Sequence, residues 1–336
     1  MNYFIERLPR LNTLNIYVSI NITNVSLNDN SILINNSIII PINVSKSNNF
    51  DILPSSNGFT CIRIKINTIP ITHDDNIYDK YKWNNKQLNK ILNESTNNSS
   101  FNCISCNSKL INFNKIKKFL PMPSELWYEM LDYWHCHKPN EEDKSSNNSK
   151  ILKKFNSLKP ITNGIIIGTY YFIINPSDWG LIIKGIDENK DIHCSNCDQL
   201  LGSLDENSGS YKLLKWNLKC NDEIFTKSSF VTIRLLEEIN YSAVRQFILS
   251  YNDIKIKVWC FGVGIDISIN NQNYNDCLKI LFMEYNETVD SSIPILEITY
   301  EESLIEFINS LKEINSQLPL PLKNFKNWYV SYVKLE

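Results

Sequence analysis

The N-terminal part of the chain alternates apolar and polar residues in short runs bounded by asparagine, serine and aspartate. Leu14 to Val25 alternates loosely, Ile32 to Val44 is a β-branched run, and Phe59 to Ile66 alternates cleanly. A period of two predicts half-buried β-strands, and the polar clusters between them predict turns. Residues 1–92 are therefore predicted to be mainly strands of an antiparallel sheet, sandwich or open barrel. A polar loop follows at 93–100.

The rest of the chain mixes two periodicities. Further strands are predicted at 164–174, 179–186, 211–218, 230–236, 254–269, 278–285 and 328–333. Apolar residues recur instead at helical spacing over 241–251 and over 301–315, and Pro319 and Pro321 end the second helix. The predicted fold class is α+β, with β-rich antiparallel sheets and a few helices. We expect an N-terminal β domain at 1–100 and an α+β region at 101–336, or one interlocked unit.

Composition and charge narrow the classes of function. Hydrophobic residues make up 43% of the chain, and the formal net charge is −2. A near-neutral chain has no general attraction to nucleic acid or to an anionic membrane, so we expect neither as a direct partner. No apolar run reaches the roughly 18 residues that a spanning helix needs, and the first residues lack a signal-peptide pattern. We therefore expect a cytoplasmic and nuclear protein whose cysteines stay reduced.

Two cysteine pairs share one pattern. Cys103-Ile-Ser-Cys106 and Cys194-Ser-Asn-Cys197 are each followed, after three more residues, by leucine. This is the form of a zinc knuckle, a tight turn that directs two thiolates inward while backbone amides bond to the sulfurs. Two knuckles supply the four thiolates of a closed structural zinc site. We therefore predict that Zn²⁺ joins two segments that lie far apart in the sequence.

Other arrangements of the cysteines stay open at this point. Four reduced core cysteines need no metal, and a redox Cys-x-x-Cys would need a thioredoxin-like strand and helix that neither pair has. A second metal grouping combines Cys103 and Cys106 with Cys136 and His137. It leaves Cys194 and Cys197 to pair with His193 or Cys220. One zinc per chain favours the four-cysteine site, and two favour the second grouping.

A tryptophan-rich segment lies between the two cysteine pairs. Pro123 or Ser124 can begin a helix in which Trp127, Met130, Leu131 and Trp134 share a face that we expect to be buried. The opposite face carries Glu125, Glu129, Asp132 and Cys136, and His137 follows. The acidic face and His137 are candidate partner-binding residues. Cys136 between two histidines is a candidate nucleophile, although the nearby carboxylates raise the pKa of a thiol.

These motifs together resemble a known family. The resemblance rests on the first knuckle, on the central motif, on the second knuckle ending in Leu201-Gly202, and on Leu318-Pro319 followed by Trp328. In the central motif the matching residues are Pro121, Pro123, Ser124, Glu125, Trp127, Glu129, Asp132, Trp134, Cys136 and His137. The sequence is similar to the HECT-like proteins that bind ubiquitin-conjugating enzymes.

The resemblance implies a ubiquitin-ligase-like protein that engages a charged conjugating enzyme. Fungal members of the family are tied to pre-mRNA 3′-end cleavage and polyadenylation through the metallo-β-lactamase-type endonuclease of that machinery. True HECT ligases carry their acceptor cysteine close to the C-terminus, whereas the last cysteine here is Cys277. Their N-terminal lobe is mostly helical, whereas the N-terminal third of this chain is predicted to be strands.

Two functions from different classes follow. The first is a binding and stabilising protein whose zinc-joined, β-rich scaffold engages a partner such as the 3′-end endonuclease. The second is a ubiquitin ligase that accepts ubiquitin on Cys136 or passes it directly from the conjugating enzyme. The sequence favours the first, because no cysteine lies in a clearly activating environment.

Overall fold

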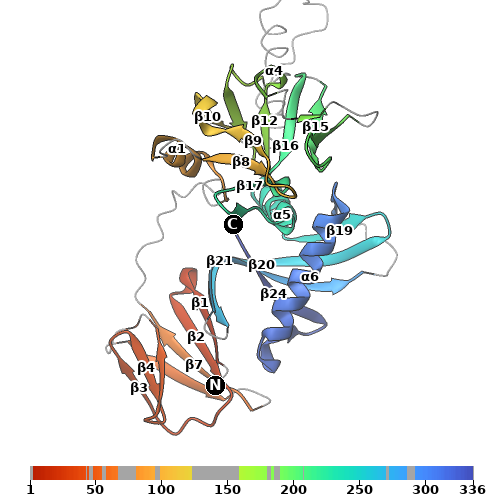
Figure 1. The fold of residues 1–336 in the computed structure, drawn as a ribbon. Coiled ribbons are helices and arrows are strands. Elements are labelled where there is room, and N and C mark those ends of the chain that lie inside the picture. Colours follow the sequence, from red (N-terminus) through yellow and green to blue (C-terminus); the bar gives the residue numbers. More distant parts are fainter. Residues whose placement is uncertain are drawn as a thin grey trace, which may run out of the picture. The chain divides into compact units, whose positions relative to one another are not determined.

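The computed structural model describes residues 3–42, 44, 48–54, 58–66, 81–94, 99–122, 159–179, 183–184, 190–206, 208–269, 272–285 and 292–335 (Figure 1). The chain divides into two compact units. Unit 1 comprises Met1–Asp74 and Arg234–Leu335, and unit 2 comprises Asp75–Ile233. Each unit has its own sheets, and both are dominated by antiparallel strand pairs. The predicted β-rich α+β class is therefore confirmed.

Unit 1 is built on a ten-stranded sheet that contains strands from both the N-terminal and the C-terminal part of the chain. The main strand order is β23-β24-β21-β20-β1-β2-β7-β6, and β19 joins the sheet between β20 and β22. The strands are β1 (Tyr3–Leu8), β2 (Thr13–Val18), β6 (Phe50–Pro54), β7 (Thr60–Lys65), β19 (Gln246–Tyr251), β20 (Ile254–Ile269), β21 (Gln272–Glu284), β22 (Ile295–Glu297), β23 (Asn324–Phe325) and β24 (Trp328–Lys334).

The pairing of β1 with β20 explains why the units do not follow the predicted domains 1–100 and 101–336. These strands are antiparallel, with Phe4 opposite Ile269 and Arg7 opposite Asp266. The N-terminal strands therefore belong to the same sheet as the C-terminal ones, and unit 2 lies between them in the sequence. Periodicity identifies strands but does not say which strands pair, so it does not reveal that the N-terminal and C-terminal strands share one sheet.

A smaller three-stranded sheet completes the N-terminal part of unit 1. It contains β3 (Val25–Asn28), β4 (Ser31–Ile34) and β5 (Ile38–Pro41), in sequential order. The predicted run from Ile32 to Val44 is thus a hairpin rather than one strand. Its isoleucines pack with those of β1, β2 and β7 in a single apolar cluster, in which Ile16, Ile32 and Ile62 are fully buried. The alternation seen in the sequence corresponds to this one-sided core.

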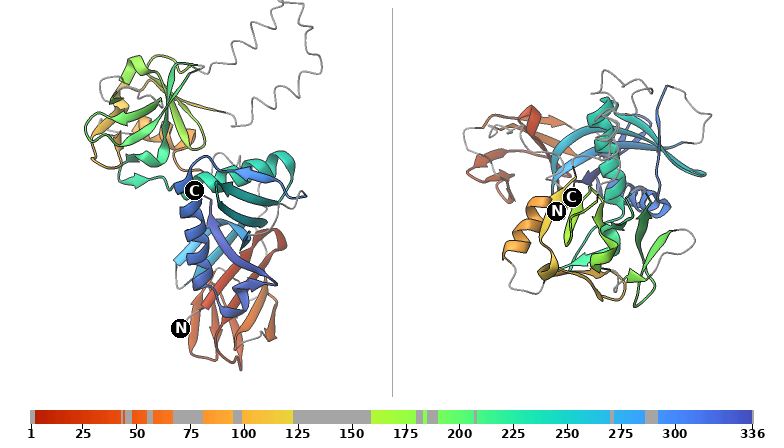
Figure 2. Two further views of the ribbon diagram at one scale, coloured as in Figure 1. Left: turned by 90° about the vertical axis from the view of Figure 1, so that its right-hand side faces the viewer. Right: turned by 90° about the horizontal axis from the view of Figure 1, so that it is seen from above.

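The helix α6 (Glu301–Gln317) confirms the predicted amphipathic helix over 301–315. Leu304, Phe307 and Leu311 are fully buried, and the helix packs against β24 (Figures 1 and 2). Glu301 and Glu302 lie in its first turn, where the helix dipole favours negative charge. The helix ends at Leu318, before the two prolines.

Two predictions in the segment 230–251 are wrong. The predicted strand 230–236 lies inside α5 (Ser228–Ser242), and most of the predicted helix 241–251 is β19. Phe230, Val231, Ile233 and Leu235 are all buried, so this helix is apolar around much of its circumference and its helical period is hidden. The helix ends before Ala243, which has a left-handed φ of 59°.

Unit 2 contains a seven-stranded and a four-stranded sheet. The orders are β10-β11-β12-β16-β15-β14-β13 and β18-β17-β8-β9. The strands are β8 (Ser100–Cys103), β9 (Lys109–Asn112), β10 (Lys118–Pro121), β11 (Gly164–Ile167), β12 (Tyr171–Ile174), β13 (Ile183–Lys184), β14 (Asp191–Cys194), β15 (Leu200–Asp205), β16 (Ser210–Leu214), β17 (Leu218–Cys220) and β18 (Glu223–Ile224). The helices α1 (Asn85–Glu94) and α4 (Pro176–Trp179) accompany them; α1 was not predicted.

A buried lysine ties three segments of unit 2 together. Lys215 is 1% exposed, and its Nζ donates to the backbone carbonyls of Thr169 at 2.9 Å and of Lys82 and Trp83 at 3.4 Å each. The Nζ also lies 5.3 Å from the centre of the Phe172 ring. Carbonyl dipoles and an aromatic face thus replace the water that an ammonium group loses on burial.

Among the described residues, no helix combines the length and the apolar character that crossing a bilayer requires.

Candidate metal centre

The first cysteine pair forms the turn between β8 and β9. The amide of Cys103 donates to the carbonyl of Ser108 at 2.9 Å, and the amide of Asn107 donates to the carbonyl of Cys103 at 3.0 Å. Asn107 adopts a left-handed φ of 59°, a conformation that asparagine tolerates better than most residues. The turn leaves the amides of Ser105 and Cys106 directed at the Cys103 sulfur.

The second pair repeats this geometry between β14 and β15. The amide of Cys194 donates to the carbonyl of Gln199 at 2.8 Å, and the amide of Asp198 donates to the carbonyl of Cys194 at 2.9 Å. Asp198 has a φ of 62°, matching the equivalent position in the first turn. The amides of Asn196 and Cys197 point at the Cys194 sulfur. The two turns are therefore equivalent knuckles, as the shared sequence pattern predicted.

The two knuckles meet and form one cluster of four sulfurs, which we call the cysteine clasp (Cys103, Cys106, Cys194 and Cys197). All four Sγ atoms lie within 4.8 Å of one another. Cys103 Sγ is 3.6 Å from Cys197 Sγ, and Cys106 Sγ is 3.8 Å from Cys194 Sγ. The sulfurs of a tetrahedral ZnS₄ site lie about 3.8 Å apart, given Zn–S bonds of about 2.3 Å. The clasp can therefore hold a metal ion, and its spacing suits a tetrahedral one.

Polar neighbours favour the thiolate form of Cys106, whereas burial disfavours it at Cys103. The side-chain amide of Asn196 and the hydroxyl of Ser108 lower the pKa of Cys106 to about 5. Burial raises the pKa of Cys103 to about 12. The Ser108 hydroxyl lies 3.0 Å from Cys106 Sγ and 3.3 Å from Cys194 Sγ, so one side chain contacts both knuckles. Four sulfurs this close cannot all ionise without a cation among them.

Two further contacts hold the knuckles in place. Ser105 Oγ donates to Gln199 Oε1 at 2.7 Å, directly between the two turns. The leucines that follow each pair, Leu110 and Leu201, are fully buried. Neither Ser105 nor Ser108 was predicted to be part of the site. Their only sequence signal was their position within or next to a Cys-x-x-Cys turn.

Gly202, the residue after Leu201, has a steric role. A Cβ at this position would lie 1.9 Å from the carbonyl oxygen of Lys212 in the neighbouring strand β16. The strands β15 and β16 pair here, with Gly202 opposite Leu213. A side chain would force these strands apart immediately beyond the second knuckle, so the Leu-Gly ending reflects close packing of the backbone.

His193 and Cys220, two candidates of the alternative metal grouping, lie within the described residues. Nδ1 of His193 lies 3.0 Å from the carbonyl oxygen of Asp198, so this ring contacts the second knuckle's backbone. Cys220 is buried in β17, and burial raises the pKa of its thiol to about 12. Neither belongs to a metal-type cluster within the described ranges. The candidates Glu125, Glu129, Asp132, Cys136 and His137 all lie outside the described residues.

The remaining described cysteines offer no activated thiol. Cys61, Cys220, Cys260 and Cys277 are buried, and burial raises the pKa of each. For Cys260 and Cys277 the pKa is about 12. These thiols are protonated and inaccessible near neutral pH, which suits packing and not nucleophilic catalysis.

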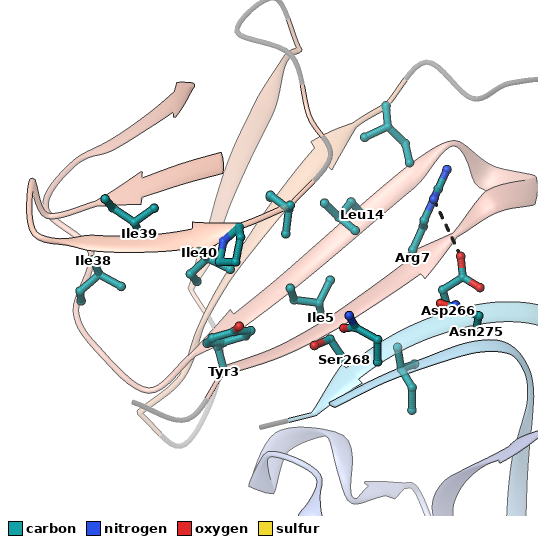
Figure 3. Close-up of a pocket in the computed structure, with 15 residues that line it drawn as sticks. Tyr3, Ile5, Arg7, Leu14, Ile38, Ile39, Ile40, Asp266, Ser268 and Asn275 are labelled. Carbon is teal, nitrogen blue, oxygen red and sulfur yellow. Dashed lines mark ion pairs between the residues drawn. The ribbon is translucent and has the colours of Figure 1, made fainter. Parts of the chain in front are cut away.

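Unit 1 contains a cavity of about 740 Å³ between β1, β5 and β20 (Figure 3). Its wall is part apolar, with Ile5, Leu14 and Ile40, and part polar, with Ser268 and Asn275. The ion pair drawn in Figure 3 joins Arg7 to Asp266 at 3.9 Å. Both residues of this pair line the cavity.

Fold and site together define a β-rich protein in which a four-cysteine clasp joins hairpins from two sheets. The chain belongs to the family of HECT-like ubiquitin-conjugating enzyme (E2)-binding proteins, whose sequence profile matches residues 6–330. The match includes both units and both knuckles.

Individual relatives agree with this assignment. An uncharacterized protein of Saccharomyces cerevisiae is 30% identical over 264 residues, which cover 76% of this chain and 73% of that protein. An uncharacterized protein of Schizosaccharomyces pombe is 24% identical over 288 residues, 80% of this chain and 81% of the relative. An E3 ubiquitin-protein ligase of Rattus norvegicus is 31% identical over 104 residues, 31% of this chain and 24% of the ligase. No solved structure is significantly similar.

Proposed function

We propose that the chain is a binding protein of the ubiquitin system that engages a ubiquitin-conjugating enzyme. The observation that carries this proposal is the family match over residues 6–330, since the family is described by its binding of these enzymes. The acidic residues Glu125, Glu129 and Asp132, together with His137, form the proposed partner-binding surface. The proposed location is the cytoplasm and the nucleus, where conjugating enzymes act.

The metal of the clasp is, in this proposal, a structural Zn²⁺. The four cysteines occupy all four positions of a tetrahedral site, and no position remains for water or substrate. The ion links the β8–β9 hairpin to the β14–β15 hairpin and neutralises part of the thiolate charge. Its role is to hold these two hairpins together.

A more specific partner rests on the resemblance of the central motif to fungal proteins. The proposed partner is the endonuclease subunit of the cleavage and polyadenylation factor, which the chain binds and stabilises during mRNA 3′-end processing. Two fungal relatives that align with about three quarters or more of this chain support a fungal branch of the family. A tagged chain should co-purify this endonuclease together with a conjugating enzyme.

The alternative is a HECT-like ubiquitin ligase. The local similarity to the rat ubiquitin-protein ligase favours it, and Cys136 is its candidate acceptor. The family description favours the binding function, and none of the described cysteines outside the clasp offers a second acceptor, because each is buried with a raised pKa. A thioester needs an accessible thiolate.

One experiment separates the two functions. The purified chain is incubated with conjugating enzymes charged with labelled ubiquitin, and reducible adducts are resolved on non-reducing gels. Complex formation without an adduct supports the binding function. An adduct that disappears in Cys136→Ser, with metal content and conjugating-enzyme binding retained, establishes the ligase instead. If no conjugating enzyme binds in either form, the proposed function is wrong.

A further inference from the structure

A small basic pocket lies in unit 1 where β20 departs from regular pairing. It has a volume of about 320 Å³ and is lined by the β1–β2 turn, by Arg245, by residues 261–265 of β20 and by Lys279 of β21. The register between β20 and β21 shifts between Cys260 and Gly262 and again between Val263 and Ile265. These irregularities bend the strand away from its partner and leave space beside it.

Two glycines make this irregular backbone possible. Gly264 has a φ of +76°, a conformation that other residues adopt only with strain. At Gly262 a Cβ would lie 2.8 Å from the Cδ1 of Ile265. Both glycines belong to the segment Gly262-Val263-Gly264 of β20. Its role here is to shape the wall of the pocket.

The charge around the pocket is positive. Arg10 and Arg245 are both exposed, and neither forms an ion pair within the described part of the chain. Lys279 donates to Glu6 at 2.6 Å, so its charge is largely neutralised. Among the described residues, no aspartate or glutamate lines the pocket. Two arginines therefore supply net positive charge, and the planar guanidinium group is well matched to a phosphate.

Aromatic rings continue from the pocket across the same part of the sheet. Phe261 lines the pocket and is 48% exposed. Its ring centre lies 5.3 Å from that of Trp259 and 6.2 Å from that of Phe325, which is 44% exposed. Trp259 in turn lies 6.1 Å from Trp328. We call these four residues the aromatic row.

Lysines accompany the aromatic row. Lys257 Nζ lies 5.7 Å from the ring centre of Trp328, and Lys326 Nζ lies 5.9 Å from that of Phe325. One cation thus lies beside Trp328 and another beside Phe325 in the edge strand β23. An acidic peptide needs only the cations, whereas a chain of bases and phosphates uses both the cations and the rings.

We propose that the basic pocket and the aromatic row bind single-stranded nucleic acid. A phosphate lies between Arg10 and Arg245, and a base stacks on Phe261, with further bases on the row. The whole-chain charge of −2 predicted no such binding, but that sum averages over surfaces of opposite sign. The site lies in unit 1, is separate from the cysteine clasp, and does not depend on the proposed function.

Fluorescence anisotropy with labelled oligonucleotides of about 12 nucleotides tests the proposal on the full-length chain. We expect the single strand to bind more tightly than a duplex of the same length. RNA and DNA of one sequence are compared, because both carry the required bases and phosphates. In Arg10→Gln/Arg245→Gln the slope of log affinity against log salt should fall by about 0.7, because the two arginines share one phosphate contact. Phe261→Leu should weaken binding about tenfold through lost stacking.

A matched control separates this site from general charge effects. Lys90→Gln/Lys118→Gln removes the same two positive charges from exposed positions in unit 2 and should leave affinity and salt slope unchanged. Thermal unfolding curves that match the parent show that the variants are folded. The proposal is overturned if the parent shows no binding at about 50 mM salt. It is equally overturned if the control loses as much affinity as the arginine variant. Competition by a polyglutamate peptide as strong as that by unlabelled oligonucleotide would identify the site as one for acidic protein.

Discussion

Replacement of one clasp cysteine, Cys103→Ser, is the most direct test of the metal centre. Cys103 is fully buried, and its sulfur lies 3.6 Å from that of Cys197. A serine hydroxyl is a poor ligand for a soft tetrahedral site, so the variant should lose the metal. The parent should contain one metal ion per chain by elemental analysis, which also separates the clasp from the two-metal grouping.

The loss of stability on metal removal should be large, because few other contacts link the two knuckles in the described residues. Besides contacts to the sulfurs, which include those of Ser108 and Asn196, an exposed hydrogen bond from Ser105 to Gln199 joins the described parts of the two knuckles. A ligand present at a thousand times its dissociation constant stabilises the folded state by about 4 kcal/mol. Structural zinc in small domains binds with about 10–16 kcal/mol at neutral pH. Unit 2 should therefore lose at least about 4 kcal/mol when its metal is removed.

Thermal unfolding with and without a strong chelator measures this loss. Chelation should lower the unfolding temperature of the parent but should leave that of Cys103→Ser unchanged. Cys220→Ala is the matched control, since Cys220 is buried in the same unit outside the clasp. It should cost about 1 kcal/mol and keep its metal. The metal centre would be refuted if the parent contained no metal and its unfolding temperature did not change with the chelator. It would also be refuted if Cys103→Ser kept one metal ion per chain.

Three further predictions concern the packing around these sites. Gly202→Ala should destabilise unit 2 by at least about 3 kcal/mol in urea unfolding, because the new methyl group would overlap a backbone carbonyl of β16. The control Gly209→Ala, with nothing within 4 Å of the added atom, should cost only about 1–2 kcal/mol. Lys215→Met should cost about 2–4 kcal/mol in the same assay, because it leaves three carbonyls, two of them in buried bonds, without their charged donor. An unchanged unfolding midpoint would contradict that role. Burial, reinforced by Glu6, raises the pKa of Tyr332 well above its usual value. The neutral phenol therefore contributes its full share to the free energy of unfolding below about pH 10, and this contribution is lost as the pH rises further. Circular dichroism should show that Tyr332→Phe loses less of the folded unit 1 at alkaline pH than the parent does.

The errors in the sequence-based prediction have a common cause. The segment 230–236 was predicted to be a strand because its residues are β-branched and apolar, yet it is a helix buried on most sides. The segment 246–251 was predicted to be a helix, yet it pairs with β20 and β22. Hydrophobic periodicity distinguishes a helix from a strand where one face is buried and the other is exposed to solvent, as in α6. It does not distinguish them where both faces are buried.

The candidate site was predictable to the extent that it is local. Each Cys-x-x-Cys turn encodes its own geometry through a left-handed Asn107 or Asp198 and through amides that point at the sulfurs. The participation of Ser108 was not predictable, because its hydroxyl contacts Cys194, which lies 86 positions further along the chain.

The sequence by itself determined the β-rich class, the amphipathic helix α6 and the two knuckles, because each depends on residues within one turn or one short period. Only the tertiary structure decided that the first strand pairs with β20, that the four cysteines meet, and that Arg10 and Arg245 line one pocket. These outcomes depend on which strands pair across hundreds of residues. Strand pairing is selected by the free energy of burying whole sheet faces together, and no local pattern records that choice.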